Sequence, residues 1–282
     1  MSVLHGTLTI ARLTWLEARR RRIVLAAVIG GLLYVTVFGI AAHFSVQQVL
    51  QGQSFETLRY RAELQIMTLA GLYVANFLAI AVAILLPVDT FSGEIATGVM
   101  QTLASKPVRR FEILLGKWLA YCGMSCGYLL LVTGGVAGVT WWESGYINPS
   151  LLTAAPYLLL GVIVMTSFTI TGGIRLTTVT NGMAAFAVYA IAFIGGWVEQ
   201  IGFALGSDGA RRVGTAISLF SPADTMWRKA AYELTPAFMR ELSSATPFGA
   251  GSAPSTAMVI WTCGVIAGVV GLGVLLFRRR PL

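Results

Sequence analysis

Six runs of about 20 apolar residues divide this chain, and no other feature restricts its fold as strongly. A helix that rises about 1.5 Å per residue crosses roughly 30 Å of hydrocarbon with a run of this length. The alternative, a closed barrel, needs short segments of alternating polarity, and the sequence lacks them. Of 282 residues, 56% are hydrophobic and 11% are charged, which is outside the usual composition of soluble domains. The sequence therefore predicts an all-α membrane protein with six transmembrane helices.

The spans are predicted at about residues 23–42, 65–88, 112–140, 151–173, 182–203 and 256–277. We assign residues 1–282 to a single transmembrane domain. Basic residues gather before span one, between spans two and three, and after span six. The positive-inside rule then places both termini in the cytoplasm. We expect a multi-pass protein of the inner (plasma) membrane of a bacterial or archaeal cell.

The segment 3–19 precedes the first span and has an amphipathic pattern. Leu4, Leu8 and Trp15 share one helical face, and a run of four arginines, 19–22, follows. We expect an interfacial helix that lies on the inner leaflet as an elbow before the first span. A cleavable signal peptide is the alternative, although the apolar run that follows is longer than a typical signal-peptide core.

Two polar segments are expected outside the cell. Residues 43–63 join spans one and two, and residues 204–255 join spans five and six. Within the longer segment, Ser221 is a candidate N-cap and Pro222 suits the first helical position, so we expect external amphipathic helices there. On the inner side, residues 174–181 are expected to form a tight turn, and a second contact with a partner is the alternative.

A few residues inside the spans favour helix packing. Asn76 is polar at membrane depth, which is typical of a hydrogen bond between helices, with a role in the transport path as the alternative. Small residues four apart in the third span, Gly123 with Gly127 and Gly134 with Gly138, allow helices to approach closely.

The polar segment 89–111, between spans two and three, carries a helical pattern of its own. Asp89 or Thr90 is a candidate N-cap, and Pro107 ends the helix because the residue before proline disfavours helical geometry. Glu94 falls on the more polar face. The apolar residues recur every four positions and form one stripe: Phe91, Ile95, Val99 and Leu103. The pattern predicts a docking helix, and an ordinary helix on the membrane surface is the alternative.

This stretch resembles the loop signature of ABC-2 permeases, the membrane subunits of one class of ATP-binding-cassette transporters. That signature reads roughly E-x-E-x-G-T, then a leucine-rich turn, then P-V-x-R and I-L-L-G-K. The matching residues are Glu94, Gly98, Pro107, Val108, Arg110, Ile113, Leu114, Leu115, Gly116 and Lys117. Ala96 and Val99 depart from it, since an acid and a threonine are common there. The resemblance implies that 89–111 holds a cytoplasmic coupling helix that sits in a groove on a separate ATPase chain.

The resemblance also implies the partners. Two permease copies, most simply a homodimer, would pair with two ATPase subunits and form the path between them, usually for export. The chain has no G-x-x-x-x-G-K-[ST] loop, so the partner ATPase would bind the ATP and Mg²⁺, and we expect no cofactor or metal on this chain. NosY-type permeases, which serve copper-enzyme maturation, have a similar span layout and stay open as an alternative.

Other classes are less well supported by the residues. An intramembrane enzyme needs an acid pair, histidine ligands or a nucleophile with its base at one depth, and the spans hold no such set. A membrane scaffold is the remaining class. The net charge of +8 comes from residues beside the spans, so no nucleic-acid role is expected. Cys122 and Cys126 are expected to be buried small residues, with a soft-metal pathway as the alternative.

Overall fold

The computed structural model describes residues 3–51, 57–98, 109–236 and 254–280. Within these ranges the secondary structure is helical and contains no strand. The helices are α1 (Val3–Ala18), α2 (Arg22–Gln51), α3 (Thr57–Leu85), α4 (Ser92–Ala96), α6 (Arg110–Ser144), α7 (Leu151–Gly173), α8 (Thr178–Ala204), α9 (Asp208–Phe220), α10 (Ala223–Leu234) and α12 (Thr256–Arg278).

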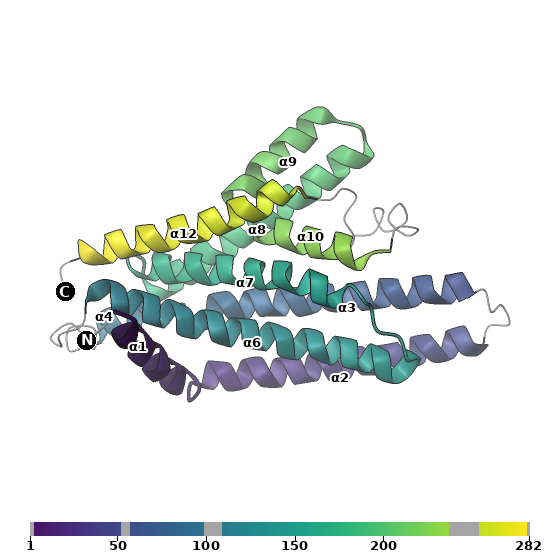
Figure 1. The fold of residues 1–282 in the computed structure, drawn as a ribbon, viewed down its shortest axis with the longest axis horizontal. Helices are drawn as coiled ribbons and strands as arrows, with labels where there is room; N and C mark the ends of the chain where they lie inside the picture. Colours follow the sequence, from purple (N-terminus) through teal and green to yellow (C-terminus); the bar gives the residue numbers. More distant parts are fainter. Residues whose placement is uncertain (1–2, 52–56, 99–108, 237–253, 281–282) are drawn as a thin grey trace.

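Six of these helices, α2, α3, α6, α7, α8 and α12, are long and apolar enough to cross a membrane. The prediction of an all-α membrane protein with six spans is therefore confirmed. Figure 1 shows α2, α3, α6 and α7 side by side along the long axis, with α12 running along α7. The chain termini and α4 all lie at one end of this bundle, which we name the α4 end; the opposite end is the far end.

The helices at the far end are longer than the predicted spans. The segment 43–63 largely continues α2 and α3 as helix, because residues 43–51 and 57–63 contain no proline or glycine. His43 Nδ1 lies 2.9 Å from Glu143 Oε2, so the extended part of α2 contacts the end of α6. By contrast, α7 begins and ends where span four was predicted, at residues 151 and 173.

The buried apolar side chains form two clusters. The larger cluster lies where α3, α6, α7 and α10 meet, and Leu72, Leu129, Met165 and Trp227 belong to it. The smaller cluster lies at the α4 end and joins Phe91, Leu114, Tyr121 and Phe277. The turn that leads into α4 is therefore packed into the bundle and contributes to its core.

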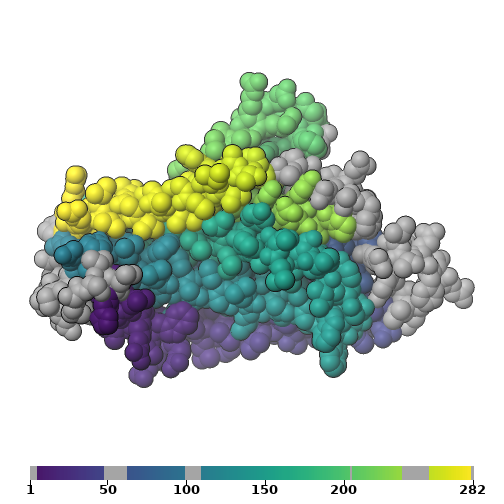
Figure 2. Space-filling model, in the orientation of Figure 1, coloured from purple at the N-terminus to yellow at the C-terminus, as the bar shows by residue number. Residues whose placement is uncertain are grey.

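Two helices, α9 and α10, occupy the described part of the segment predicted to hold external helices. α9 pairs with α8, and the pair projects from the body of the molecule (Figures 1 and 2). α10 instead packs against α7 and buries Met226, Trp227 and Ala230. The predicted cap at Ser221 was wrong. Pro222 is the N-cap residue of α10, no side chain caps that helix, and Ser221 ends α9.

The C-terminal end of α10 is fixed at the far end by polar contacts. The Leu234 carbonyl oxygen accepts hydrogen bonds from Gln65 Nε2 at 2.6 Å and from Asn148 Nδ2 at 2.8 Å. Tyr146 donates its hydroxyl proton to Gln65 Oε1 at 3.1 Å. These bonds satisfy a helix-terminal carbonyl that would otherwise be buried without a partner. They join α10 to α3 and to the connection between α6 and α7.

Candidate ATPase-coupling site

The predicted coupling helix is shorter than the sequence pattern indicated. α4 ends at Ala96, and Gly98 has a φ of +75°, a left-handed conformation that glycine adopts without strain. The stripe therefore holds for Phe91 and Ile95 but does not continue along one helix to residue 103. Of the other predicted coupling residues, Val99, Leu103 and Pro107 lie outside the described residues.

The start of α4 also differs from the prediction. The N-cap residue is Phe91, and no side chain caps the helix, so neither Asp89 nor Thr90 has the predicted capping role. Asp89 instead binds a basic residue at the junction of α1 and α2. Its Oδ1 lies 2.6 Å from Nη1 of Arg21, and Arg21 also pairs with Glu17 at 2.9 Å. The turn before α4 is thus joined to the elbow region.

Phe91 anchors this turn in the smaller core cluster. Its side chain is 1% exposed, and its ring packs edge-on against the ring of Phe277 in α12, with the ring centres 5.2 Å apart. Nζ of Lys117 lies 5.8 Å from the centre of the same ring, within the range of a cation–π contact. The first residue of the predicted stripe therefore contacts two spans.

Glu94 and Lys117 form a buried ion pair between α4 and α6. Lys117 Nζ donates a hydrogen bond to Glu94 Oε1, and the side chain of Lys117 is 4% exposed and that of Glu94 11%. The second carboxylate oxygen of Glu94 is buried without a hydrogen-bond partner among the described residues. Glu94 was predicted on the more polar face of the helix, and a lysine 23 residues later in the chain covers it there. The pair fixes α4 to the start of α6.

Arg110 and Gly116 also make contacts inside the subunit. Nη1 of Arg110 donates hydrogen bonds to three carbonyl oxygens at the end of α12, those of Phe277 at 3.2 Å, Arg278 at 3.2 Å and Arg280 at 2.7 Å. Such a cation at a helix C-terminus satisfies carbonyls that lack an intrahelical partner. At Gly116, a methyl group in place of hydrogen would lie 2.7 Å from the Thr7 carbonyl oxygen, so glycine lets α1 cross α6 closely.

α1, the segment for which an interfacial elbow helix was predicted, lies across α6 and exposes apolar side chains. Trp15 contacts α6 at Gly123, where an added methyl group would lie 3.0 Å from the indole ring. Leu8 is 60% exposed and Trp15 42%, so the subunit does not cover these side chains, and a position of α1 on the membrane surface stays a prediction. The side chain of Leu4 lies outside the described ones.

The turn between α7 and α8 packs against the same site. Nδ2 of Asn181 donates to the carbonyl oxygens of Val88 at 3.0 Å and Thr169 at 2.9 Å. The hydroxyl oxygens of Ser92 and Thr178 lie 2.8 Å apart. Sequence reasoning treated 174–181 as a tight turn and missed that Asn181 joins it to the chain ahead of α4. The available signal in the sequence was an asparagine directly before the predicted span 182–203.

Comparison with known protein families shows the family of this chain. The family model described as ABC-2 family transporter protein matches residues 8–282. This chain belongs to the ABC-2 transporter family. Members of this family are typically the non-enzymatic membrane permeases of ABC transporters, which partner with an ABC ATPase and the lipid bilayer. No curated protein matches the chain.

Other residues singled out in this ABC-2 permease have different surroundings. Asn76 is 4% exposed inside the subunit, so helix packing stays the prediction that its burial favours. A side chain at Gly127, Gly134 or Gly138 would meet no atom within 4 Å, so these three do not hold helices together within one subunit. No group of three potential metal ligands occurs in the described part of the permease.

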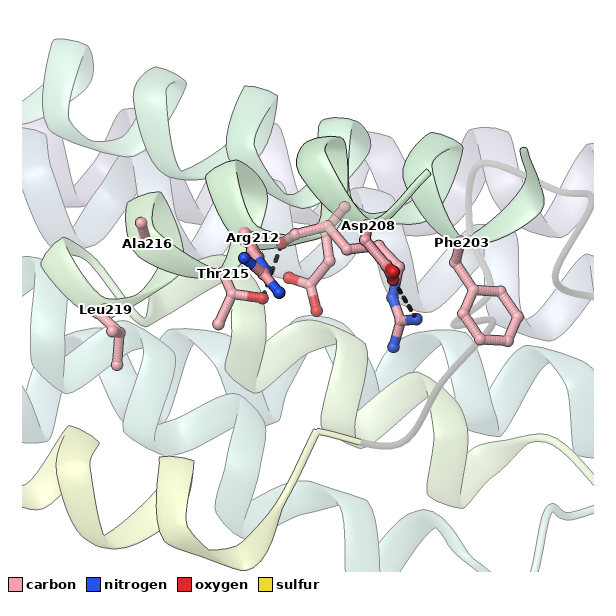
Figure 3. Close-up of a pocket in the computed structure, with 8 residues that line it drawn as sticks. Phe203, Asp208, Arg212, Thr215, Ala216 and Leu219 are labelled. Atoms are coloured by element: carbon pink, nitrogen blue, oxygen red, sulfur yellow. Dashed lines mark hydrogen bonds and ion pairs between the residues drawn. The ribbon is translucent and has the colours of Figure 1, made fainter. Parts of the chain in front are cut away.

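A cavity of about 440 Å³ lies beside the α8–α9 pair of the permease (Figure 3). Arg212, Thr215 and Asp208 of α9 line it together with Phe203 of α8 (Figure 3). Arg211 pairs with Asp208 at 3.5 Å and lies over the Phe203 ring at 5.7 Å. Sequence reasoning did not find this cavity, because it depends on how α9 folds back along α8.

Next to this cavity, the buried Arg228 of α10 joins three helices. It pairs with Asp224 at 3.1 Å and with Glu199 of α8 at 2.9 Å, and it donates to the Ser218 hydroxyl of α9 at 3.0 Å. Burial raises the pKa of Asp224 to about 6, although Arg228 lowers it in part. Two acids share one buried cation here, so the group carries one negative charge when both acids are ionised.

Proposed function

We propose that this ABC-2 permease is driven by a separate ATPase that docks on the segment 89–111 at the α4 end. The observation that carries the proposal is the buried Glu94–Lys117 pair, which fastens the loop between two spans to the span that follows. A loop that merely connected α3 and α6 would not need a desolvated ion pair, which is costly unless it fixes a geometry. A partner that pushes on this loop would move the spans with it.

In this proposal the predicted coupling residues divide into two groups. The side chains of Phe91, Glu94, Arg110 and Lys117 are occupied inside the subunit, so they hold the loop in position. Ala96, Thr97 and Arg109 are exposed at the points where the described chain leaves and rejoins the bundle. The ATPase groove would therefore receive residues 96–109, where the predicted contacts Val99, Leu103 and Pro107 also fall.

The contacts around α4 would transmit a movement of α4 to the membrane-spanning helices α6, α8 and α12. α4 is held to α6 by Glu94, to α8 by the hydroxyl pair of Ser92 and Thr178, and to α12 through Phe91. Closure of an ATPase dimer would displace α4 and these helices together, as a rigid-body switch between two packings. ATP and Mg²⁺ would bind the ATPase rather than this chain.

Membership of the family supports a proposal for the assembly and the cargo. Two permease copies, as a homodimer, would pair with two ATPase subunits in a plasma membrane, with both permease termini in the cytoplasm. α2 and α12 have the smallest buried share among the six spans, 11% each, which leaves apolar surface for lipid or for the second copy. Few charges lie within the spans, which favours export of an amphipathic or lipidic cargo.

The test is co-purification of the tagged permease from its native membrane in mild detergent. We expect an ATP-binding chain in equal amount, whose association is lost in Thr97→Trp because the bulky ring would occupy the docking surface. Leu205→Trp is the matched control, since Leu205 is 76% exposed away from α4. Reproducible absence of an ATPase from folded wild-type protein would overturn the proposal and return weight to the enzyme and scaffold classes.

A further inference from the structure

An apolar groove runs between the elbow helix and three other segments near the α4 end. Its volume is about 250 Å³, and it is lined by Trp15 of α1, Val28 of α2, Leu86 after α3, and Met124 and Leu131 of α6. None of these side chains is charged. The groove therefore suits an apolar occupant.

Gly127 explains why this groove is open. On α6, Gly123 receives the ring of Trp15, whereas a side chain at Gly127, one turn later, would meet no atom within 4 Å. Both glycines belong to the motif that predicted close helix packing. Only the first of them packs against a helix within the subunit, and the second leaves the space that forms part of the groove.

One residue that lines the groove is basic. Arg19 is among its lining residues and is exposed, and Arg20 and Arg22 beside it are exposed as well. Arg21 differs from them, because it pairs with Glu17 and Asp89. An occupant thus meets apolar side chains and one guanidinium group, and a guanidinium group binds phosphate well.

We propose that the groove binds one acyl chain of an anionic phospholipid from the inner leaflet, with its phosphate at Arg19. A packed helix is about 10 Å across and is too wide for a groove of this volume, whereas an acyl chain is slender. With Leu8 and Trp15 exposed, α1 would lie on the inner leaflet and would hold Arg19 at the depth of lipid headgroups. The lipid would join α1 to Leu86, at the start of the turn that leads to α4.

The experiment is native mass spectrometry of the purified permease, delipidated and then titrated with phosphatidylglycerol or phosphatidylcholine. We expect one phosphatidylglycerol to be retained per chain in preference to phosphatidylcholine, and a higher melting temperature with it. Arg19→Gln should weaken phosphatidylglycerol binding by about fivefold, since one basic residue near a membrane surface contributes about that factor.

Gly127→Leu should fill the groove and abolish the retained lipid, whereas Gly134→Leu, an equally open position two turns along α6, should not. Equal retention in Gly127→Leu and wild type, or equal binding of both lipids, would overturn the proposal. If Gly127→Leu fails to fold, Arg19→Gln still tests the proposal, because Arg19 is exposed and its substitution should not prevent folding. The binding does not depend on whether an ATPase docks on α4.

Discussion

The charged side chains at the α4 end are used mainly within the subunit. Glu94 pairs with Lys117, Arg110 caps α12, and Arg21 binds Asp89. Each of these contacts joins residues that are far apart in the sequence. A loop signature in this family thus combines residues that position the loop with residues that are free to contact a partner.

Removal of one member of the Glu94–Lys117 pair tests this interpretation. Glu94→Gln should leave the lysine buried without its counter-ion and lower the free energy of unfolding by about 3 kcal/mol or more. The double variant Glu94→Lys with Lys117→Glu should recover part of that loss. Thermal unfolding in detergent and ATPase stimulation by the assembled transporter measure the two effects.

The control is Glu233→Gln, which breaks the more exposed pair of Lys229 and Glu233 at 3.6 Å. A pair of this kind contributes at most about 1 kcal/mol, so the control should unfold close to wild type. Wild-type stability and coupling in Glu94→Gln would contradict a positioning role for the pair.

The sequence signature grouped residues that the fold brings together, but it did not predict what their side chains contact; their role in coupling stays a prediction. The signature indicated Glu94, Arg110, Gly116 and Lys117, and all four lie together around the α4 end. Their directions could not be predicted, because helical periodicity says which residues share a face but not what covers that face. The lysine that covers Glu94 comes from another helix.

At the scale of elements, the apolar runs predicted the positions of the long helices well. Where helices begin and end in the polar segments was predicted poorly. Span four matches α7 at both ends because a polar residue or glycine limits the run on each side. α2 and α3 continue beyond their apolar runs, since polar residues with good helix propensity, such as Gln47 and Gln48, extend a helix into water. α4 stops early because Gly98 follows it. Gly98 was assigned to the ABC-2 loop signature in the sequence, and its tendency to end a helix was not used.

Among the elements, α10 holds a residue, Asp224, that should make the stability of the fold depend on pH. Asp224 has a pKa of about 6 in the fold, above its ordinary value of 3.8, because burial disfavours its ionised form. The folded state therefore binds a proton that the unfolded chain has already released between these two values. Stability should rise as the pH falls from about 7 to about 5, and the gain is lost as the pH rises through about 6.

The variant Asp224→Asn should remove most of this dependence. Its melting temperature in detergent should vary less with pH than that of wild type over the same range, because no proton is taken up at that position. A wild-type melting temperature that does not change with pH would contradict the assignment to Asp224. So would a melting temperature that falls equally in wild type and variant as the pH is lowered.

At the scale of the whole molecule, polar contacts between helices gather at the α4 end, at the far end and around Arg228. At the α4 end, the elbow, the turn before α4, the α7–α8 turn and the end of α12 are joined by polar contacts. At the far end, Gln65, Asn148 and the end of α10 form a second group. Between them the contacts are largely apolar. An even number of spans requires that both termini share the side of α4, as Figure 1 shows.

The positive-inside rule assigns the α4 end to the cytoplasm, and cysteine labelling tests that assignment. In a variant with Cys122, Cys126 and Cys263 replaced by alanine, single cysteines are introduced at Thr97, Arg279 and Ile147. The first two are exposed at the α4 end, and Ile147 is 56% exposed at the far end. A membrane-impermeant maleimide should label Ile147→Cys in intact cells, and Thr97→Cys and Arg279→Cys only after the membrane is opened. The opposite labelling pattern would invert the orientation, place the basic run 19–22 outside, and remove the docking surface from the compartment that contains ATP.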